Sequence, residues 1–299
     1  MAPPVARGKD PALDIDVVVS AHANARALHH TLLGFASQTQ LPATVWVAED
    51  GQDPDVAQVV RAHRAGSGLA IRHLNQPHQG FRKWQLVNRA IAQSRASWMV
   101  FTDADCVPRR DLLAQYRRLA RPGRFVAAGS HVELPREFHE SRLTDEMVVQ
   151  QRIFDHRFLQ HAGLKLPAMR LLPAGWAARL LDALTPRSAW VGNNAGAWRE
   201  DLLRVAGFDE TMGYGGGDRN LGIRLEHAGV RGQRARHSLV CLHLAHERPW
   251  RDPARVARNK QWNRELEQRR DEWLPRASSL LPGAARPGFE ADDLVSTAR

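Results

Sequence analysis

Residues 98–105 read WMVFTDAD, in which the apolar run Trp98–Thr102 leads directly into Asp103-Ala104-Asp105. A short run rich in aromatic and β-branched residues predicts a buried strand. Two runs of the same kind precede it, Ile15–Ser20 (IDVVVS) and Val45–Ala48 (VWVA). The three runs therefore predict neighbouring strands in the core of an α/β fold.

Segments with a helical period lie on either side of these strands. Apolar residues recur three or four positions apart in Ala27–Gln38, Asp55–Ala65 and Lys83–Ser94. Strands that alternate with helices predict a parallel sheet with right-handed crossovers and helices on its faces. With 299 residues, 43% of them apolar, the chain is long enough to bury such a core.

Polar side chains stand where each predicted strand ends. The first strand ends in Ser20-Ala21-His22, the second in Glu49-Asp50-Gly51 and the third in Asp103-Ala104-Asp105. Ligands of parallel α/β sheets bind beyond the carboxyl ends of the strands, and buried carboxylates are costly without a partner. These ends therefore predict a polar ligand, a cation, or both.

The pattern changes after about residue 124. The segments that follow are a strand at Val126–Leu134, a helical stretch at Thr144–Leu184, the small and aromatic run Trp190–Trp198, a helix at Arg199–Ala206, the glycine cluster Gly213–Gly217 followed by Asp218, a helix at Arg219–Ala228 and a strand at Ser238–Leu244. We divide the chain into a flexible N-terminus (1–12), a first ligand-binding half (13–125), a helical insertion (126–189), a second half (190–250), and a charged C-terminal helix with a tail (251–299).

Candidate metal ligands occur in two places. Asp103 and Asp105 offer the hard oxygen ligands that Mg²⁺ and Mn²⁺ prefer. An Asp-x-Asp tripeptide alone is more typical of a solvated loop or a helix cap, and the buried strand before it makes the two interpretations about equal. His243 and His246 are candidates for a nitrogen ligand, although most histidines are ordinary surface or packing residues. With Cys241 they would suggest zinc, but the sequence offers no local fourth ligand to complete a structural site.

The glycine cluster Gly213–Gly217 lacks the Lys-Ser/Thr of a phosphate-binding P-loop and the preceding strand of a dinucleotide site. It predicts a flexible loop whose backbone approaches a ligand and ends in Asp218 at the N-cap of a helix. An aspartate there is either a structural cap or a general base.

The formal net charge is +10, with 42 Lys and Arg against 32 Asp and Glu. This charge suits nucleic acid, an anionic membrane or a phosphorylated small molecule. Trp262, Leu266 and Trp273 share one face of the predicted C-terminal helix, which indicates either core packing or weak contact with the inner membrane face. With no apparent signal peptide or spanning segment, and with only two cysteines, we expect a cytoplasmic protein.

The order of these motifs over about residues 14–249 resembles that of family 2 glycosyltransferases of the GT-A fold. The matching segments are Ile15–Ser20, Glu49-Asp50-Gly51, Gly80-Phe81-Arg82-Lys83 with Asn88, Asp103-Ala104-Asp105, Gly192-Asn193-Asn194, Gly207-Phe208-Asp209-Glu210, Gly213–Asp218 and His243–His246. The segments of the second half resemble the galactosyltransferase-type acceptor domain of bacterial polysaccharide synthases.

The resemblance implies a Rossmann-like, mostly parallel sheet flanked by helices, with a helical insertion and a C-terminal helix. It implies inverting transfer of a sugar from a nucleoside-diphosphate sugar, most typically a UDP-sugar, to a glycan or lipid-linked saccharide in cell-surface polysaccharide or lipopolysaccharide synthesis. Asp218 would be the catalytic base. A divalent Mn²⁺ or Mg²⁺ would be held by Asp105 and His246, assisted by Asp103 or His243. The residues implied for the donor are Ser20, His22, Asp50, Gly80, Arg82, Asn88 and Asp103.

The chain departs from the family pattern at Gly217, where relatives usually have a glutamate linked to acceptor binding. Two other classes would use some of the same features. A metal-dependent nucleotidyltransferase would use the carboxylates without the motifs of the second half, and a nucleic-acid-binding protein would use the basic charge. The sequence contains no recognisable nucleic-acid motif, so we expect a nucleotide sugar and a saccharide as partners and no nucleic acid.

Overall fold

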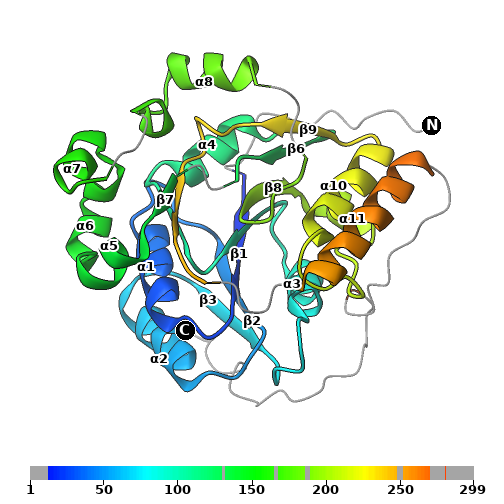
Figure 1. Ribbon diagram of the computed structural model, residues 1–299, viewed down its shortest axis with the longest axis horizontal. Helices are drawn as coiled ribbons and strands as arrows, with labels where there is room; N and C mark the ends of the chain where they lie inside the picture. Colours follow the sequence, from blue (N-terminus) through cyan, green and yellow to red (C-terminus); the bar gives the residue numbers. More distant parts are fainter. Residues whose placement is uncertain are drawn as a thin grey trace.

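The computed structural model describes residues 13–129, 132–164, 168–185, 189–247, 252–269 and 280. A seven-stranded sheet in the order β3-β2-β1-β4-β8-β6-β9 forms its centre, and helices cover both faces (Figure 1). A second sheet of three strands has the order β5-β10-β7. The predicted α/β class with a mostly parallel central sheet is confirmed.

The first half of the chain alternates strands and helices. Its elements are β1 (Ile15–Ala21), α1 (Ala25–Ala36), β2 (Thr44–Glu49), α2 (Pro54–Gly66), β3 (Ile71–Asn75), α3 (Lys83–Gln93) and β4 (Trp98–Asp103). Strand β1 pairs in parallel with β2 and β4, and β2 pairs in parallel with β3. All three pairings bring the carboxyl ends of the strands to one edge of the sheet, where the polar clusters lie.

The elements that follow β4 complete the same sheet and form the small one. Its elements are β5 (Cys106–Pro108), α4 (Leu112–Leu119), β6 (Arg124–Ala127), β7 (Val132–Leu134), β8 (Asn194–Trp198), α9 (Arg199–Arg204), α10 (Gly217–His227), β9 (Arg231–Arg234), β10 (Cys241–Leu244) and α11 (Pro253–Gln268). Strand β8 lies antiparallel between β4 and β6. The two halves therefore share one continuous sheet.

Short helices connect β7 to β8. They are α5 (Arg136–Ser141), α6 (Asp145–Val149), the 3₁₀ helix η1 (Arg152–Phe154), α7 (His156–His161), the 3₁₀ helix η2 (Ala168–Leu171) and α8 (Trp176–Ala183). Figure 1 shows them along one side of the molecule, beyond α1 and β7, with α8 at the outer edge.

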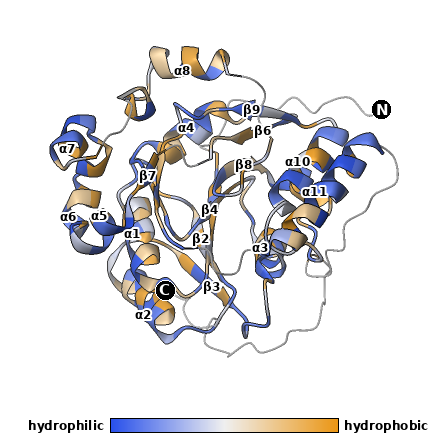
Figure 2. Cartoon of the chain, in the orientation of Figure 1, coloured by the Kyte–Doolittle hydropathy of each residue, from blue (hydrophilic) through white to orange (hydrophobic). Residues whose placement is uncertain are grey.

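Apolar side chains gather on both faces of the main sheet. One cluster packs α1, α2 and α4 against β1, and includes the buried residues Val17, Val19 and Leu28. The other packs α3 and α10 on the opposite face around Trp84, Phe208 and Leu221. Figure 2 shows the strands largely in hydrophobic colours and α11 largely in hydrophilic ones. The burial of both sheet faces explains why the parallel strands are continuous apolar runs.

Two strand predictions were wrong in their bounds. The strand predicted at Val126–Leu134 is β6 in the main sheet and β7 in the small sheet, and Gly129 between them has a left-handed φ of +68° that ends the first strand. The strand predicted at Ser238–Leu244 begins at Cys241. The edge strands of the main sheet, β3 and β9, were not predicted, because their sequences IRHLN and RGQR are largely polar.

Candidate functional site

The end of β2 positions Asp50, the first residue predicted to bind the donor. Its side chain is 5% exposed. Oδ2 accepts a hydrogen bond from the backbone N–H of Arg82 (2.6 Å), and Oδ1 accepts one from the Gln76 amide (2.9 Å). His22 Nδ1 donates to the Asp50 carbonyl at 2.8 Å, and the His22 ring lies 4.5 Å from the His78 ring. These contacts fix a polar, ring-lined corner at the ends of β1 and β2.

Gly80 and Arg82 belong to the loop that precedes α3. Gly80 has a φ of +77°, a left-handed conformation that favours glycine. The Arg82 guanidinium donates to the carbonyl of Pro77, and its buried Nε has no partner among the described residues. Ser20 lies on β1 in register with Asp103 of β4. The donor residues predicted on β1 and in the loop before α3 thus lie at the same edge of the sheet.

Asp103 and Asp105 follow β4 but face different partners. Asp103 Oδ1 accepts from the Lys83 ammonium at 2.6 Å. Burial alone would lower the pKa of Lys83, but the carboxylates of Asp103 and Asp218 raise it above its usual value. Lys83 is therefore positively charged and is fixed in place by its ion pair with Asp103. The sequence alone indicates no role for Lys83, because only the fold brings the start of α3 beside the end of β4.

Asp105 lies with His243 and His246, and these three residues offer ligand atoms within 4.8 Å of one another. His246 Nε2 is 2.9 Å from Asp105 Oδ2, and His243 Nε2 is 3.7 Å from Asp105 Oδ1. His246 Nδ1 donates to the Glu247 carbonyl at 2.7 Å, the kind of contact that orients a metal-binding imidazole. Burial acts to raise the pKa of Asp105, but the hydrogen bond from His246 and the neighbouring histidine charges lower it overall.

This donor set of one carboxylate and two imidazoles fits a divalent cation. The group does not include Asp103, which is paired with Lys83. Nor does it include Cys241, whose thiol is buried and has a raised pKa because of that burial. The zinc alternative that the sequence left open therefore lacks its sulfur ligand.

Asp218 lies at the start of α10, beside the turn before β8. Burial, together with the charge of Asp103, raises the pKa of Asp218 to about 6, while Lys83 and a backbone hydrogen bond from Gly192 act to lower it. Its Oδ1 is buried with no hydrogen-bond partner in the part of the chain that the structure describes. A Cβ on Gly192 would lie 2.0 Å from this oxygen, so glycine is needed there. Asp218 therefore has one carboxylate oxygen that makes no hydrogen bond to the described residues and can accept a proton.

The prediction that Asp218 caps the helix was wrong. The N-cap is Gly216, whose φ of +125° suits glycine, and Asp218 is the second residue of α10. The loop is held instead by α11, where Asn259 donates to the Gly215 carbonyl and Asn263 to the Gly216 carbonyl, both at 2.9 Å.

Gly217 stands against the indole of Trp84, and a Cβ at this position would lie 2.7 Å from the ring. Trp84 is buried and stacks on Phe208 with ring centroids 4.6 Å apart. A glutamate at Gly217 would therefore collide with this tryptophan. The indole of Trp84 thus accounts for glycine, in place of the glutamate of the family pattern, at this position, and the sequence alone gives no signal for this role of Trp84.

Asn88, which we expected near the donor, is placed elsewhere. It is fully buried, and its amide joins α3 to the loop before α10. Nδ2 donates to the Phe208 carbonyl and to Glu210, and Oδ1 accepts from the Phe208 N–H, each at 2.8 Å. These bonds engage the whole amide, so the structure corrects this prediction: Asn88 fastens the two halves together.

For the face predicted on the C-terminal helix, the structure favours core packing, one of the two alternatives, at Leu266. Leu266 is 4% exposed, and Asn259 and Asn263 are buried beside it on α11. Trp262 is half-buried, and Trp273 lies outside the described residues. This side of α11 therefore packs against its own domain.

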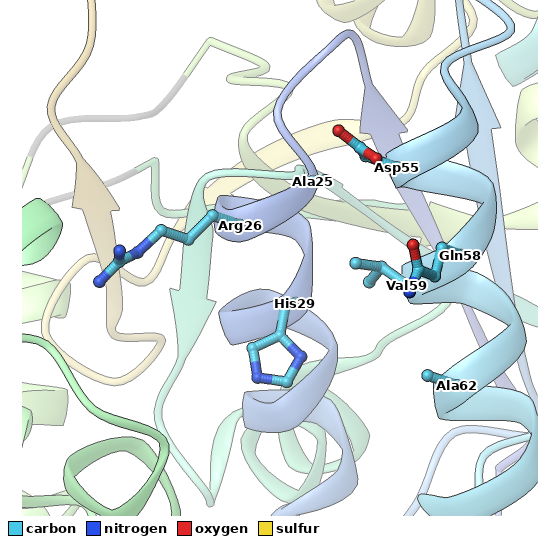
Figure 3. A pocket seen from close by; sticks show the side chains of 7 residues that line it. All are labelled: Ala25, Arg26, His29, Asp55, Gln58, Val59 and Ala62. Atoms are coloured by element: carbon cyan, nitrogen blue, oxygen red, sulfur yellow. The ribbon is translucent and has the colours of Figure 1, made fainter.

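A second group of ligand-type side chains joins α1 to α6. His29 Nε2 lies 2.9 Å and His30 Nε2 3.5 Å from Asp145 Oδ1, and His63 Nε2 lies 3.0 Å from His29 Nδ1. Figure 3 shows His29 beside a surface pocket between α1 and α2. None of the residues predicted for the site lines this pocket, and the mutual hydrogen bonds of the group serve to hold the insertion onto the core.

The fold, with polar side chains at the carboxyl ends of its parallel strands, is the GT-A fold of glycosyltransferases. The sequence model of glycosyl transferase family 2 matches residues 16–179. The chain belongs to this family and is a glycosyltransferase. No curated protein sequence matches it significantly.

Solved glycosyltransferases share the fold. The mannosyltransferase PcManGT from Pyrobaculum calidifontis, in complex with GDP-Man and Mn²⁺, is 20% identical with a TM-score of 0.56, over 91% of this chain and 70% of that one. TarS 1–349 of S. aureus, in complex with UDP-GlcNAc, is 12% identical with a TM-score of 0.56, over 90% of this chain and 70% of that one. GalNAc-T7 with UDP, GalNAc and Mn²⁺ is 13% identical with a TM-score of 0.57, over 86% of this chain and 48% of that one.

Proposed function

We propose that the protein transfers a sugar from a nucleoside-diphosphate sugar to a hydroxyl of a saccharide acceptor, with inversion at the anomeric carbon. The observation that carries this proposal is Asp218. It combines a pKa of about 6 with a buried, unpartnered oxygen at the junction of the two halves. A general base for a sugar hydroxyl must be ionised near neutral pH and needs a carboxylate oxygen that is free to accept the proton.

The reaction is a single displacement. The acceptor oxygen forms a bond to the anomeric carbon while its proton passes to the Asp218 carboxylate. The bond between that carbon and the diphosphate oxygen breaks on the opposite side, and its electron pair leaves with the diphosphate. Lys83, held between Asp103 and Asp218, supplies a fixed positive charge beside the departing phosphates.

Donor binding is assigned to the corner formed by β1, β2 and the loop before α3. Asp50 and His22 hold the base, Asp103 and Ser20 lie toward the ribose, and Gly80 and Arg82 face the phosphates. Asp105, His243 and His246 would hold a divalent ion, which would supply Lewis-acid neutralisation of the diphosphate. Mn²⁺ or Mg²⁺ is proposed because Mn²⁺ accompanies nucleotides in two of the similar structures.

We propose UDP as the nucleotide carried by the donor, and a glycan or lipid-linked saccharide of cell-surface polysaccharide or lipopolysaccharide synthesis as the acceptor. The acceptor half is taken to be of the galactosyltransferase type, with the wall formed by Trp84 and Gly217 in place of a glutamate. A cytoplasmic location follows from this role. The nucleotidyltransferase and nucleic-acid alternatives account for neither family membership nor Asp218.

Thermal shift with UDP, GDP, ADP and CDP, each with and without Mn²⁺, tests donor and metal together. A ligand that binds only the folded state raises the unfolding midpoint. We expect UDP with Mn²⁺ to give the largest rise, and Asp105→Asn to abolish the Mn²⁺-dependent part because an amide lacks the charge that the ion needs. The surface variant Asp55→Asn is the matched control. A rise that is the same with and without Mn²⁺ would remove the metal from the proposal.

A further inference from the structure

Helix α8 carries an apolar stripe that faces solvent. Trp176 is 77% exposed, Leu180 52% and Leu184 73%. Residues four positions apart lie on one side of a helix, so these three side chains form one continuous face. Met169 of η2, 54% exposed, adds a fourth apolar side chain nearby in the chain. Such a face is unusual, because a surface helix normally turns its apolar side inward.

The opposite side of α8 packs on the protein. Asp182 accepts from the backbone N–H groups of His237 at 2.8 Å and Ser238 at 3.1 Å, and Ala178 is fully buried. Asp182 and Ala178 lie opposite Trp176 and Leu180 around the helix. The helix is therefore fixed with its apolar stripe outward, at the outer edge of the molecule in Figure 1.

Exposed arginines lie on the same two helices, η2 and α8. Arg170 and Arg179 are exposed, and Arg236 is close enough to Arg234 and Arg170 that their charges, after the larger effect of burial, lower its pKa. The repulsion between these like charges is relieved when an anionic surface lies against them. Apolar side chains that include a tryptophan, next to arginines, are the composition of a helix that lies in a lipid interface.

We propose that the α8 surface, made of Met169, Trp176, Leu180 and Leu184 with Arg170 and Arg179, docks on an anionic lipid membrane. A second copy of the chain fits less well, since a symmetric contact would set the arginines against themselves. Among the described residues no helix is long and apolar enough to cross a membrane. In this proposal the membrane contact is the α8 surface and not the C-terminal helix. The proposal rests on the proposed function and extends it, because a lipid-linked acceptor is presented at a membrane surface.

Co-sedimentation of the full chain with vesicles of phosphatidylcholine, or of phosphatidylcholine with phosphatidylglycerol, tests the proposal. We expect binding to the anionic vesicles only, and at least about tenfold weaker binding for Trp176→Ser with Leu184→Ser. Arg170→Glu with Arg179→Glu should have the same effect. Leu41→Ser, a change at a residue that is 44% exposed on the loop between α1 and β2, is the matched control and should bind as the wild type.

Circular dichroism and the unfolding midpoint check that each variant is folded. Equal binding to neutral and anionic vesicles, or unchanged binding of the Trp176 and Leu184 double variant, would overturn the proposal. The proposal would also be overturned if the wild type sedimented as a dimer and bound no vesicles, and if the double variant were a monomer. No donor is present, so vesicle binding and the nucleotide thermal shift can fail independently of one another.

Discussion

Asp218 shows how neighbours set the chemistry of a single residue. Its pKa of about 6 arises from burial and the nearby Asp103, opposed by Lys83. The sequence places a glycine loop before Asp218, but the loop alone is equally typical of a helix cap. The charge balance that suits a base depends on residues more than 100 positions away.

We expect Asp218→Asn to lower turnover by about two to four orders of magnitude, because an amide cannot accept the proton. Donor affinity, measured by calorimetry, should stay close to that of the wild type. The wild-type kcat/KM should fall as the pH drops below about 6, where the carboxylate becomes protonated, and should level off above it. Asp55→Asn is the control. Parallel loss of donor affinity and turnover would make Asp218 a binding residue instead.

Gly192 contributes by having no side chain. Its Cβ would lie 2.0 Å from Asp218 Oδ1, so Gly192→Ala must displace the carboxylate. We expect turnover to fall by about 10²-fold, the cost of a misplacement near 1 Å. Gly66→Ala is the matched control, since no atom lies within 4 Å of the Cβ it would add. Wild-type kinetics in purified Gly192→Ala would contradict the placement of Asp218.

At the scale of elements, helix α11 supports the glycine loop. Asn259 and Asn263 donate to the carbonyls of Gly215 and Gly216, and Asn220 of α10 donates to Asn263 at 3.2 Å. These amides are buried in a mainly polar contact between α10 and α11. The helix that the sequence suggested as a membrane face is therefore a support for Asp218.

Asn263→Ala should lower the free energy of unfolding by about 1–3 kcal/mol, because a buried carbonyl and the Asn220 amide both lose a partner. Turnover should fall as well, since Gly216 precedes the helix turn that carries Asp218. Urea unfolding and steady-state kinetics measure the two effects. Lys260→Ala, an exposed change on the same helix, should alter neither. If Asn263→Ala left kcat unchanged, α11 would have no role in positioning Asp218.

At the scale of the whole molecule, the histidines between α1, α2 and α6 couple stability to pH. Burial, with the charge of His29, lowers the pKa of His30 and of His63 to about 4. In the unfolded chain both would titrate near 6.5. As the pH falls from 6.5 toward 4, the unfolded state binds protons that the folded state does not, so stability is lost in that window.

We expect the free energy of unfolding to fall by about 2 kcal/mol per histidine between pH 7 and pH 5. Urea titrations at intermediate pH values measure this slope. His63→Gln should flatten it, because one of the two groups no longer titrates, whereas the exposed change His161→Ala should leave it unchanged. An identical slope in His63→Gln would show that other groups control acid unfolding.

The local sequence determined the parallel core and the polar ends of its strands. Buried strands are mainly apolar on both faces, and a continuous run such as Val17–Val19 in β1 can be recognised without the structure. The polar edge strand Arg231–Arg234 carries no such signal, because one side of an edge strand is open. The Asp105, His243 and His246 candidates were found because metal ligands are restricted to a few residue types.

Only the tertiary structure decided which residues meet. It paired Asp103 with Lys83, brought Gly192 against Asp218, used Asn88 to join the halves, and turned the apolar side of α8 outward. Each of these depends on contacts between segments far apart in the sequence, whereas periodicity reports only on neighbours a few positions away. The sequence therefore determined the class of fold and the kinds of group at its edge, and the packing of the two halves decided which of those groups act together.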